Sequence, residues 1–427
     1  MLINTQTGNI SNIDVSSEGL SLPLKIGRTY CDKVVIGNKR LFLSTPHMGG
    51  REQFYINQAF TSNYITTIGE NISQFEKKIQ STIGKGNVLA TSSGTAAIHL
   101  GLILGGVGKD DLVLCQSFTF AASANPILYQ GGIPVFIDSE KDTWNMDPAK
   151  LEEAIVSCIE GTLFKKTGSS VTKNLPGKKP KMIIPVHLYG MPAKMNEIRR
   201  IAHKYDIPVL EDAAEALGAG INGEYCGTMG KYGVFSFNGN KIITTSGGGA
   251  LVTQSMEDWK TANFLANQAK DEAPHYQHSH IGFNYRLSNI SAGIGRGQME
   301  VLDKWVTKRR KNFEYYLKHL GVIPGLGFQF EPEGFYSNRW LTAIYFEKDK
   351  IDGIDREMLR NCLEDSNIET RPLWKPLHLQ PIFENFPFFG SGVCEALFET
   401  GLCLPSGSNL TESDLDSVIA KILRCVD

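Results

Sequence analysis

Lys241 is the side chain of this sequence that could most directly do covalent chemistry. It stands in the segment SFNGNKIITTSGGG, which runs from Ser236 to Gly249 and places the lysine between a polar turn and a glycine triplet. A lysine amine can attack a carbonyl carbon and form a Schiff base. Because most loop lysines are solvated surface charges, the assignment depends on which other groups accompany Lys241.

An acidic residue, Asp212, ends the run PVLED, which reads as a short buried strand over residues 208–212. It precedes Lys241 by 29 positions (241 − 212). A carboxylate beside a pyridine nitrogen keeps that nitrogen protonated, so that the ring can act as an electron sink. Asp212 is therefore the carboxylate that we expect to accompany the lysine.

A phosphate site is indicated by the turn Ser-Ser-Gly-Thr at residues 92–95, which follows a β run and precedes an apolar helix. The start of a helix presents free N–H groups and the positive end of the helix dipole. Gly94, Thr95 and Ser236 could therefore hold a phosphate. Simple N-capping by Ser93 or Thr95 would give the same pattern.

An aromatic side chain completes the set. Phe120, in the segment SFTF, is the candidate to stack on a flat ring. A lysine, an aspartate, a phosphate cradle and an aromatic ring in one cleft describe a site for pyridoxal 5'-phosphate.

The elements that must position these groups alternate between strand and helix. Such alternation indicates an α/β fold with a mainly parallel central sheet covered by helices on both faces. Ligands then gather beyond the carboxyl ends of the strands, where the sequence places Phe120, His187, Asp212, Ser236 and Lys241. The predicted strands are residues 112–116, 133–138, 182–187, 208–212, 233–237 and 249–253.

We predict three regions along the chain: an N-terminal extension over residues 1–40, a large α/β domain over 41–300, and a linking helix with a smaller C-terminal α/β domain over 301–427. Apolar spacing predicts an amphipathic helix over 71–83 and one long helix over 294–320. Residues 159–181, rich in Lys, Gly, Pro and Ser, are expected to form a solvated mobile loop rather than a phosphate-binding patch.

The segment ETRPLWKPLH concentrates aromatic and cationic side chains between prolines. It contains Arg371, Trp374, Lys375 and His378. Such groups suit an anionic, ring-bearing ligand such as a nucleotide. The alternative is an exposed structural turn.

The balance of charge argues against nucleic-acid and membrane partners, since 43 basic and 45 acidic residues give a net charge of −2. The N-terminus lacks the pattern of a signal peptide. The eight cysteines form no C-x-x-C pair, so we expect free thiols in a reducing cytoplasm. His275, His278 and His280 cluster without an acidic or cysteine ligand at a recognisable spacing, and no metal site is expected.

The ordered motifs resemble one family over the chain from about Leu41 to the C-terminus. The motifs TSSGTAAIHL, SFTFAAS, VHLYGMPAKMNEI, LEDAAEALG, SFNGNKIITTSGGG, GFNYRLSN and ETRPLWKPLH are similar to those of the DegT/DnrJ/EryC1/StrS family of fold-type I, pyridoxal-phosphate-dependent nucleotide-sugar aminotransferases. Within it, PHMGG, the lysine segment and RPLWKPLH most resemble the 4-aminotransferases of the N-acetylbacillosamine pathway, which act on UDP-4-keto-6-deoxy-N-acetylglucosamine.

The resemblance implies a role for each residue that matches a motif. Lys241 would form the Schiff base and move protons, Asp212 would pair with the ring nitrogen, and Glu215 would lie near the ring hydroxyl. The remaining cofactor-binding residues would be Gly94, Thr95, Phe120, Ser236, Asn238 and, from the partner subunit, Asn284. Substrate-binding residues would be Tyr64, His187, Arg371, Trp374, Lys375 and His378.

The resemblance also implies the reaction and the partners. The amino donor would be L-glutamate, the cofactor would alternate between pyridoxal and pyridoxamine phosphate, and a UDP-linked keto sugar would be aminated in a homodimer with shared active sites. Amination at C3, or of a GDP or dTDP sugar, stays open. Two further alternatives are a sugar dehydratase, which has histidine in place of Lys241, and a non-catalytic regulator, for which no DNA-binding module is apparent.

Overall fold

The structure is a computed structural model that describes residues 39–347 and 355–426. The chain divides into two compact units, Met1–Lys39 and Arg40–Asp427. All of the first unit except Lys39 lies outside the described residues, and so does nearly all of the N-terminal extension predicted from sequence.

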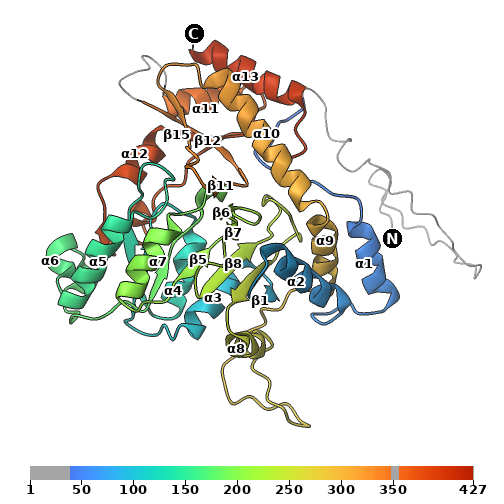
Figure 1. The fold of residues 1–427 in the computed structure, drawn as a ribbon, viewed down its shortest axis with the longest axis vertical. Helices are drawn as coiled ribbons and strands as arrows, with labels where there is room; N and C mark the ends of the chain where they lie inside the picture. Colours follow the sequence, from blue (N-terminus) through green and yellow to red (C-terminus); the bar gives the residue numbers. More distant parts are fainter. Residues whose placement is uncertain (1–38, 348–354, 427) are drawn as a thin grey trace, which may run out of the picture. The chain divides into compact units, whose positions relative to one another are not determined.

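A central sheet runs through the second unit (Figure 1). Pairing is parallel except at β9, which runs antiparallel to both its neighbours, and parallel bridges from Ile183 to Val209 and from Val186 to Asp212 join β4 to β5. The prediction of a mainly parallel sheet is confirmed. The strands, in spatial order, are β1 (Asn87–Thr91), β9 (Gly249–Thr253), β8 (Tyr232–Ser236), β5 (Leu210–Asp212), β4 (Met182–Ile184), β2 (Leu112–Gln116), β3 (Ile133–Ile137) and β14 (Phe388–Phe389).

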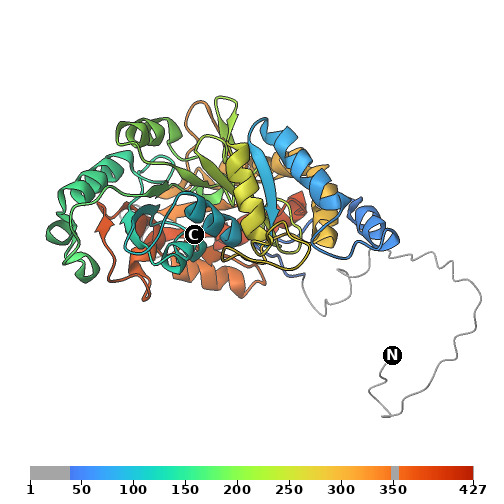
Figure 2. The ribbon, with the colours of Figure 1, turned by 90° about the horizontal axis from the view of Figure 1, so that it is seen from below.

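Helices cover both faces of this sheet (Figures 1 and 2). Alternate residues of one strand enter different cores: Leu112 and Leu114 of β2 pack with α2, α5 and α7, whereas Val113 packs with α3, α4 and α8. The bounds are α1 (Glu52–Thr61), α2 (Glu70–Ile83), α3 (Gly94–Leu104), α4 (Asn125–Tyr129), α5 (Pro148–Glu160), α6 (Leu163–Thr167), α7 (Met195–Lys204), α8 (Met256–Ala266) and α9 (Asn289–Met299), with 3-10 turns η1 (Ala121–Ser123), η2 (Ser170–Thr172) and η3 (Leu188–Gly190).

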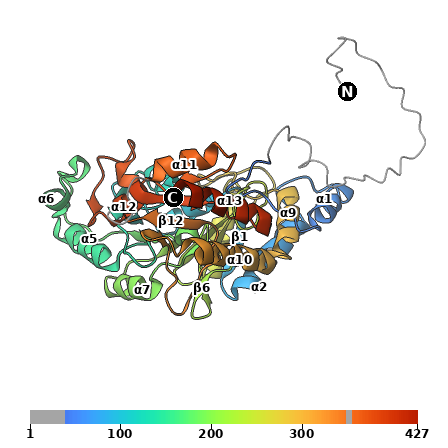
Figure 3. The same cartoon turned by 90° about the horizontal axis from the view of Figure 1, so that it is seen from above.

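A second, antiparallel sheet lies in the C-terminal part of the chain. Its order is β10 (Leu326–Phe328), β12 (Thr342–Phe346), β15 (Gly401–Leu404) and β13 (Arg371–Pro372). Its apolar side chains share a core with α10 (Leu302–Leu320), α11 (Arg356–Glu364) and α13 (Glu412–Val426). Figure 3 shows these three helices from above. The remaining elements are α12 (Val393–Thr400), η4 (Leu377–Leu379) and a small sheet of β11 (Phe335–Tyr336), β6 (Gly220–Ile221) and β7 (Glu224–Tyr225).

Two segments cross the boundary expected at residue 300. Leu41 pairs with Ile368 and joins the C-terminal core, while β14 extends the central sheet beside β3. The division into domains 41–300 and 301–427 stays a prediction.

The structure corrects two expectations about helices. The single helix expected over 294–320 is two helices, because α9 packs closely on α1 and α2 whereas α10 packs on α13, with a break at Glu300 and Val301. Leu317, which the apolar spacing of the predicted helix would bury, is 43% exposed. The loop expected over 159–181 contains α6 and η2, anchored by the buried side chain of Leu163. The helix over 71–83 is confirmed as α2, with its apolar face buried.

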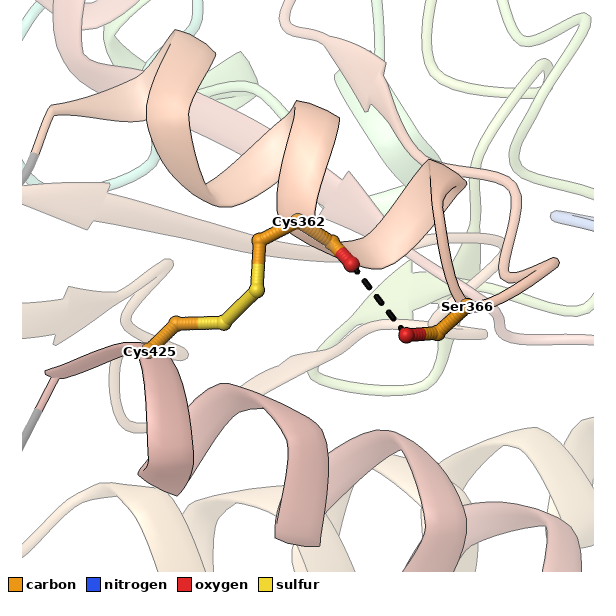
Figure 4. The surroundings of a disulfide bond; sticks show 3 residues. All are labelled: Cys362, Ser366 and Cys425. Atoms are coloured by element: carbon orange, nitrogen blue, oxygen red, sulfur yellow. Dashed lines mark hydrogen bonds between the residues drawn. A yellow bond between two sulfur atoms is a disulfide. The ribbon is translucent and has the colours of Figure 1, made fainter.

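A disulfide joins Cys362 of α11 to Cys425 of α13 (Figure 4). This pair corrects the expectation of free thiols for these two residues. The expectation holds for the five other described cysteines, Cys115, Cys158, Cys226, Cys394 and Cys403, and Cys31 lies outside the described residues. The two residues are 63 positions apart in sequence, and only the packing of α11 on α13 brings them together. Across residues 39–347 and 355–426, no helix combines the length and the apolar character needed to cross a membrane.

Candidate active site

A cavity of about 260 Å³ lies at the carboxyl ends of β5 and β8 and beside the start of α3. It contains most of the cofactor site predicted from sequence. Its lining includes Gly94, Thr95, Phe120, Asp212, Glu215, Ser236, Asn238 and Lys241. It also includes residues that the sequence had not singled out, among them Ser92, Thr119, Ser123, Val186, Ala214, Asn240 and Trp340.

The turn before α3 forms one end of the cavity. Ser93 caps the helix, since its Oγ accepts a hydrogen bond of 3.0 Å from the N–H of Ala96. A Cβ atom on Gly94 would lie 3.1 Å from the Cβ of Ser236 and 3.5 Å from its hydroxyl. The missing side chain therefore keeps open a space between the first turn of α3 and a hydroxyl donor, as a phosphate requires.

Gly249, the last residue of the glycine triplet after the lysine, has a packing role that the sequence did not predict. A Cβ atom on Gly249 would lie 2.4 Å from the backbone N of Gly94. Gly249 therefore lets β9 approach the turn at the start of α3. Gly247 and Gly248 line the cavity, and at Gly247 a Cβ atom would meet nothing within 4 Å.

Asp212 is held in one orientation. Its Oδ2 accepts a hydrogen bond of 2.6 Å from the hydroxyl of Ser123, and its Oδ1 accepts one of 3.1 Å from the N–H of Ala214. The hydroxyl of Ser123 also contacts that of Thr119 at 2.9 Å. Ser123 lies in the segment SFTFAAS, so a hydroxyl close after the aromatic residue was the signal that could have revealed it.

Lys241 points its amine at an acid and an aromatic ring. Its Nζ lies 3.4 Å from the Oε1 of Glu215 and 4.1 Å from the centre of the Trp340 ring. The indole N–H of Trp340 donates a hydrogen bond of 2.7 Å to the carbonyl of Asn240, which ties the ring to the lysine loop. Trp340 is 99 residues further along the chain (340 − 241), and no local pattern predicted this contact.

Glu215 is a buried carboxyl group at the edge of the cavity. Its Oε2 accepts a hydrogen bond of 2.7 Å from the backbone N–H of Tyr189. Burial raises the pKa of the Glu215 carboxyl, although the ammonium of Lys241 acts in the opposite direction. The amine and the carboxyl are thus paired where little water reaches them.

The residues that line the cavity provide the kinds of group that pyridoxal phosphate needs. The cavity offers an amine, a fixed carboxylate and, at the end kept open by Gly94, N–H and hydroxyl donors. Phe120 lies at the mouth, 56% exposed, with its ring centre 5.5 Å from that of Trp374. An exposed aromatic face beside a cavity is available for stacking.

Three predicted residues lie away from this cavity. Tyr64 is 53% exposed, and Asn284 is also exposed; neither lines the cavity. His187 is fully buried, with its Nε2 2.9 Å from Glu211 and its Nδ1 accepting a hydrogen bond from Ala193. Because both ring nitrogens are engaged in the interior, the expectation that His187 contacts a substrate is corrected.

The predicted substrate-binding residues of the segment ETRPLWKPLH lie in three different environments. Trp374 lines the main cavity and also a neighbouring cavity of about 420 Å³, which Arg371 lines as well. Lys375 is exposed and lines neither. His378 bonds Ser117 and Glu395 through its ring nitrogens, stacks on Phe388 and lines neither cavity; its role in substrate binding stays a prediction.

Known proteins similar to this chain agree with the chemistry of the cavity. The family model of the DegT/DnrJ/EryC1/StrS aminotransferase family matches residues 46–423. EpsN of Bacillus subtilis (strain 168), whose name assigns it as a pyridoxal phosphate-dependent aminotransferase, is 49% identical over 391 residues, covering 91% of this chain and 96% of EpsN. A GDP-perosamine synthase of Caulobacter vibrioides is 33% identical, covering 90% of this chain and 97% of that protein.

Solved structures agree with the fold. The crystal structure of a DegT DnrJ EryC1 StrS aminotransferase from Brucella abortus has a TM-score of 0.79 and 29% sequence identity, covering 88% of this chain and 95% of that one. The agreement extends over both the central sheet and the C-terminal region, since it spans most of each chain.

Proposed function

Because this chain belongs to the DegT/DnrJ/EryC1/StrS aminotransferase family, we propose that it transfers the amino group of L-glutamate to the C4 keto group of a UDP-4-keto-6-deoxy-N-acetylhexosamine. It is a pyridoxal-phosphate-dependent sugar aminotransferase. The proposed substrate is the N-acetylglucosamine derivative, and the product is a 4-amino-4,6-dideoxy sugar nucleotide.

One observation carries the proposal: the amine of Lys241 lies inside the cavity, 3.4 Å from Glu215. Pyridoxal phosphate, when bound, supplies an aldehyde for that amine and a ring that withdraws electrons from the carbon losing its proton. Asp212 would hold a proton on the ring nitrogen, and Gly94, Thr95 and Ser236 would hold the phosphate. Lys241, once free, would carry the proton between carbon atoms.

We propose that the sugar nucleotide binds in the neighbouring cavity, which adjoins the lysine. This cavity shares Asn240, Trp340 and Trp374 with the main cavity and adds the cation of Arg371. The guanidinium bonds Glu369 at 2.9 Å and is otherwise open to solvent, with 68% of the side chain exposed. A cation and a tryptophan beside an open space favour an anionic ligand that carries a flat ring.

We also propose that the active unit is a homodimer in which each subunit contributes to the other's cavity. Tyr64 and Asn284 are exposed and lie outside the cavity of their own chain. Three apolar side chains near Tyr64 are likewise exposed: Phe60 by 61%, Ile65 by 46% and Ile68 by 67%. A contiguous exposed apolar segment of this kind favours a protein interface.

The decisive experiment incubates the enzyme and L-glutamate with keto sugar nucleotides that differ in one feature at a time. The set contains UDP, GDP and dTDP forms of 4-keto-6-deoxy sugars, with and without the N-acetyl group, and a 3-keto analogue. NMR of the product reads the position of the new amine. Amination of the UDP-N-acetyl sugar at C4 supports the proposal, and amination confined to C3 or to a GDP sugar contradicts it.

A further inference from the structure

A buried arginine of α10, Arg309, contacts two residues that hold the segment carrying Lys241. Its guanidinium donates a hydrogen bond of 2.6 Å to the carbonyl of Trp340 and one of 2.9 Å to the hydroxyl of Ser44. We propose that Arg309 is a positioning residue for Lys241, acting through these two contacts. The inference rests on the proposed role of Lys241 as the nucleophile, but not on the identity of the sugar.

The two groups that Arg309 holds meet at the residue before the lysine. The hydroxyl of Ser44 donates a hydrogen bond of 2.7 Å to the carbonyl of Asn240, and the indole N–H of Trp340 donates one of 2.7 Å to the same oxygen. The four residues therefore form a closed ring of hydrogen-bonded contacts. Because Asn240 immediately precedes Lys241, the ring fixes the backbone from which the lysine side chain extends.

This ring joins segments that are far apart in the sequence. Ser44 precedes α1, Asn240 follows β8, Arg309 lies in α10 and Trp340 precedes β12. Asn240 and Trp340 line both the main cavity and the neighbouring one, and Ser44 lines the neighbouring one. Arg309 therefore acts from the interior on residues that both cavities share.

Arg309 is a buried cation that no acid neutralises. The residue is 1% exposed, and among residues 39–347 and 355–426 no carboxylate pairs with its guanidinium. Burial lowers the pKa of Arg309 to about 9, so the side chain stays protonated at neutral pH. An unpaired buried charge is costly, and net stability is therefore a weak reason for its presence.

The shape of the guanidinium explains what a charged side chain adds at this point. Its planar fork presents five N–H donors in a fixed geometry, whereas a lysine amine presents three donors on one atom. One arginine can therefore hold the Trp340 carbonyl and the Ser44 hydroxyl at the same time.

The ring bears on amino transfer because the lysine amine must reach particular atoms. The Nζ of Lys241 lies 4.1 Å from the centre of the Trp340 ring, so the residue that Arg309 holds by its carbonyl also packs beside the amine. A displacement of about 1 Å can cost about 100-fold in rate. Loss of the Arg309 contacts should therefore lower kcat more than it raises KM.

The first test measures hydrogen exchange in cofactor-free enzyme, with peptides that contain residues 238–246 read by mass spectrometry. Arg309→Met removes the donors, and exchange in this segment should rise about 10-fold or more. Ser44→Ala removes one branch of the ring and should give a smaller rise. Arg200→Met, at an exposed position of α7, is the matched control and should leave exchange unchanged. Wild-type protection of α3 in each variant distinguishes local opening from unfolding.

The second test measures the reaction of the holoenzyme with L-glutamate. Arg309→Met should lower kcat about 10- to 100-fold, with KM for glutamate changed less than about 3-fold. Arg309→Lys keeps the charge without the fork and should recover only part of kcat. Full recovery of kcat by the lysine variant would assign the effect to charge and would overturn the role of the ring.

The proposal requires both changes in folded R309M. A change in exchange alone or in kcat alone would overturn it, and so would a loss of stability towards urea with neither change, since Arg309 would then be only structural. Should R309M not fold, S44A decides, because wild-type exchange and kcat in S44A would contradict the ring.

This proposal and the proposed function can fail separately. Wild-type enzyme that does not react with L-glutamate would contradict the proposed donor, while hydrogen exchange would still test the ring. Normal turnover with glutamate but amination at C3 would contradict only the proposed substrate.

Discussion

At the scale of single residues, neighbouring side chains and backbone groups hold Asp212 and Lys241 in position in the cavity. Asp212 keeps its orientation through Ser123 and Ala214, and Lys241 keeps its position through Glu215 and Trp340. Each of these contacts connects residues that are distant in sequence, apart from that between Asp212 and Ala214. Loss of a positioning contact should therefore weaken cofactor binding without removing any group that reacts.

Ser123→Ala tests such a positioning contact. The variant leaves one oxygen of Asp212 without its hydrogen bond, and a hydrogen bond to a charged group is worth about 1.5–3 kcal/mol. Affinity for pyridoxal phosphate should fall about 10- to 100-fold, measured by absorbance titration of cofactor-free enzyme. Ser73→Ala, an exposed position on α2, is the control. Unchanged affinity in S123A would show that Asp212 does not need this bond.

Lys241→Ala tests the nucleophile. Wild-type enzyme with pyridoxal phosphate should show an absorbance band near the visible edge that borohydride bleaches, because the covalent bond to the amine is reducible. K241A should lack the bleachable band and all amino transfer. Lys260→Ala, an exposed position on α8, should keep both. A borohydride-sensitive band in K241A would assign the covalent bond to another lysine.

At the scale of elements, the positions of strands and the chemistry of turns were readable from local sequence. The predicted strands at 112–116 and 249–253 agree residue for residue with β2 and β9, and the turn at 92–95 leads into α3 as expected. Helix ends were less well predicted where packing decides them. The break between α9 and α10 follows from their different packing partners, since α9 packs on α1 and α2 whereas α10 packs on α13. The spacing of apolar residues within the segment does not reveal these partners.

Gly249→Ala tests the close approach of β9 to the start of α3. The new Cβ atom would lie 2.4 Å from the backbone N of Gly94, so the strand or the turn must move. We expect a loss of about 1–3 kcal/mol in the free energy of unfolding, measured with urea, together with weaker cofactor binding. Gly247→Ala, where a Cβ meets nothing within 4 Å, should stay within about 0.5 kcal/mol of wild type. Equal stability of the two variants would contradict the packing argument.

Asp138 tests how the C-terminal region attaches to the central sheet. Its carboxylate follows β3 and accepts hydrogen bonds from the backbone N–H groups of Ser391, Gly392, Val393 and Cys394 at the start of α12. Burial alone would raise the pKa of Asp138, but hydrogen bonds from the thiol and backbone N–H of Cys394, and from the backbone N–H groups of Ser139 and Ser391, outweigh it and hold the pKa below its usual value. Ionisation of Asp138 therefore stabilises the folded protein.

Asp138→Asn should lower the free energy of unfolding at pH 7 by about 2–4 kcal/mol, since the amide offers only one acceptor oxygen. A lowered folded-state pKa means that the stabilisation is present above the unfolded value and is lost as pH falls through the folded one. The difference from wild type should therefore narrow below about pH 4. Urea unfolding at pH 7 and below about pH 4 measures the difference in unfolding free energy, with Asp206→Asn, an exposed position, as the control. If the difference in unfolding free energy between D138N and wild type does not change with pH, the variant acts through altered hydrogen-bond geometry and not through the loss of charge.

At the scale of the whole molecule, two residues that the motif resemblance assigns to the site lie outside the cavity of their own chain. Its cavity contains the amine, the carboxylates and the phosphate cradle, while Tyr64 and Asn284 face solvent elsewhere. In a symmetric dimer each subunit could supply these residues to the other. The proposed function thus makes activity a property of the assembly.

Mixing two inactive variants tests that proposal. Lys241→Ala and Asn284→Ala each damage both sites of a homodimer, but a mixed dimer with shared sites has one intact site. Coexpression in equal amounts should restore about a quarter of wild-type amino transfer, because half of the dimers are mixed and each has one working site of two. Light scattering establishes that dimers form. No recovered activity in mixed dimers would show that Asn284 serves its own chain.

The sequence by itself determined the class of fold, the family and most of the predicted cofactor residues that the cavity brings together, because strands, turns and helix starts are encoded by neighbouring residues. Asp212 and Ser236 are the last residues of β5 and β8, and Gly94 and Lys241 follow β1 and β8. Parallel strands bring their carboxyl ends to one edge of a sheet. Only the tertiary structure decided what lies beside the lysine. Packing between distant segments placed Trp340 over its amine, Glu215 against it, and His187 in the core instead of the cavity.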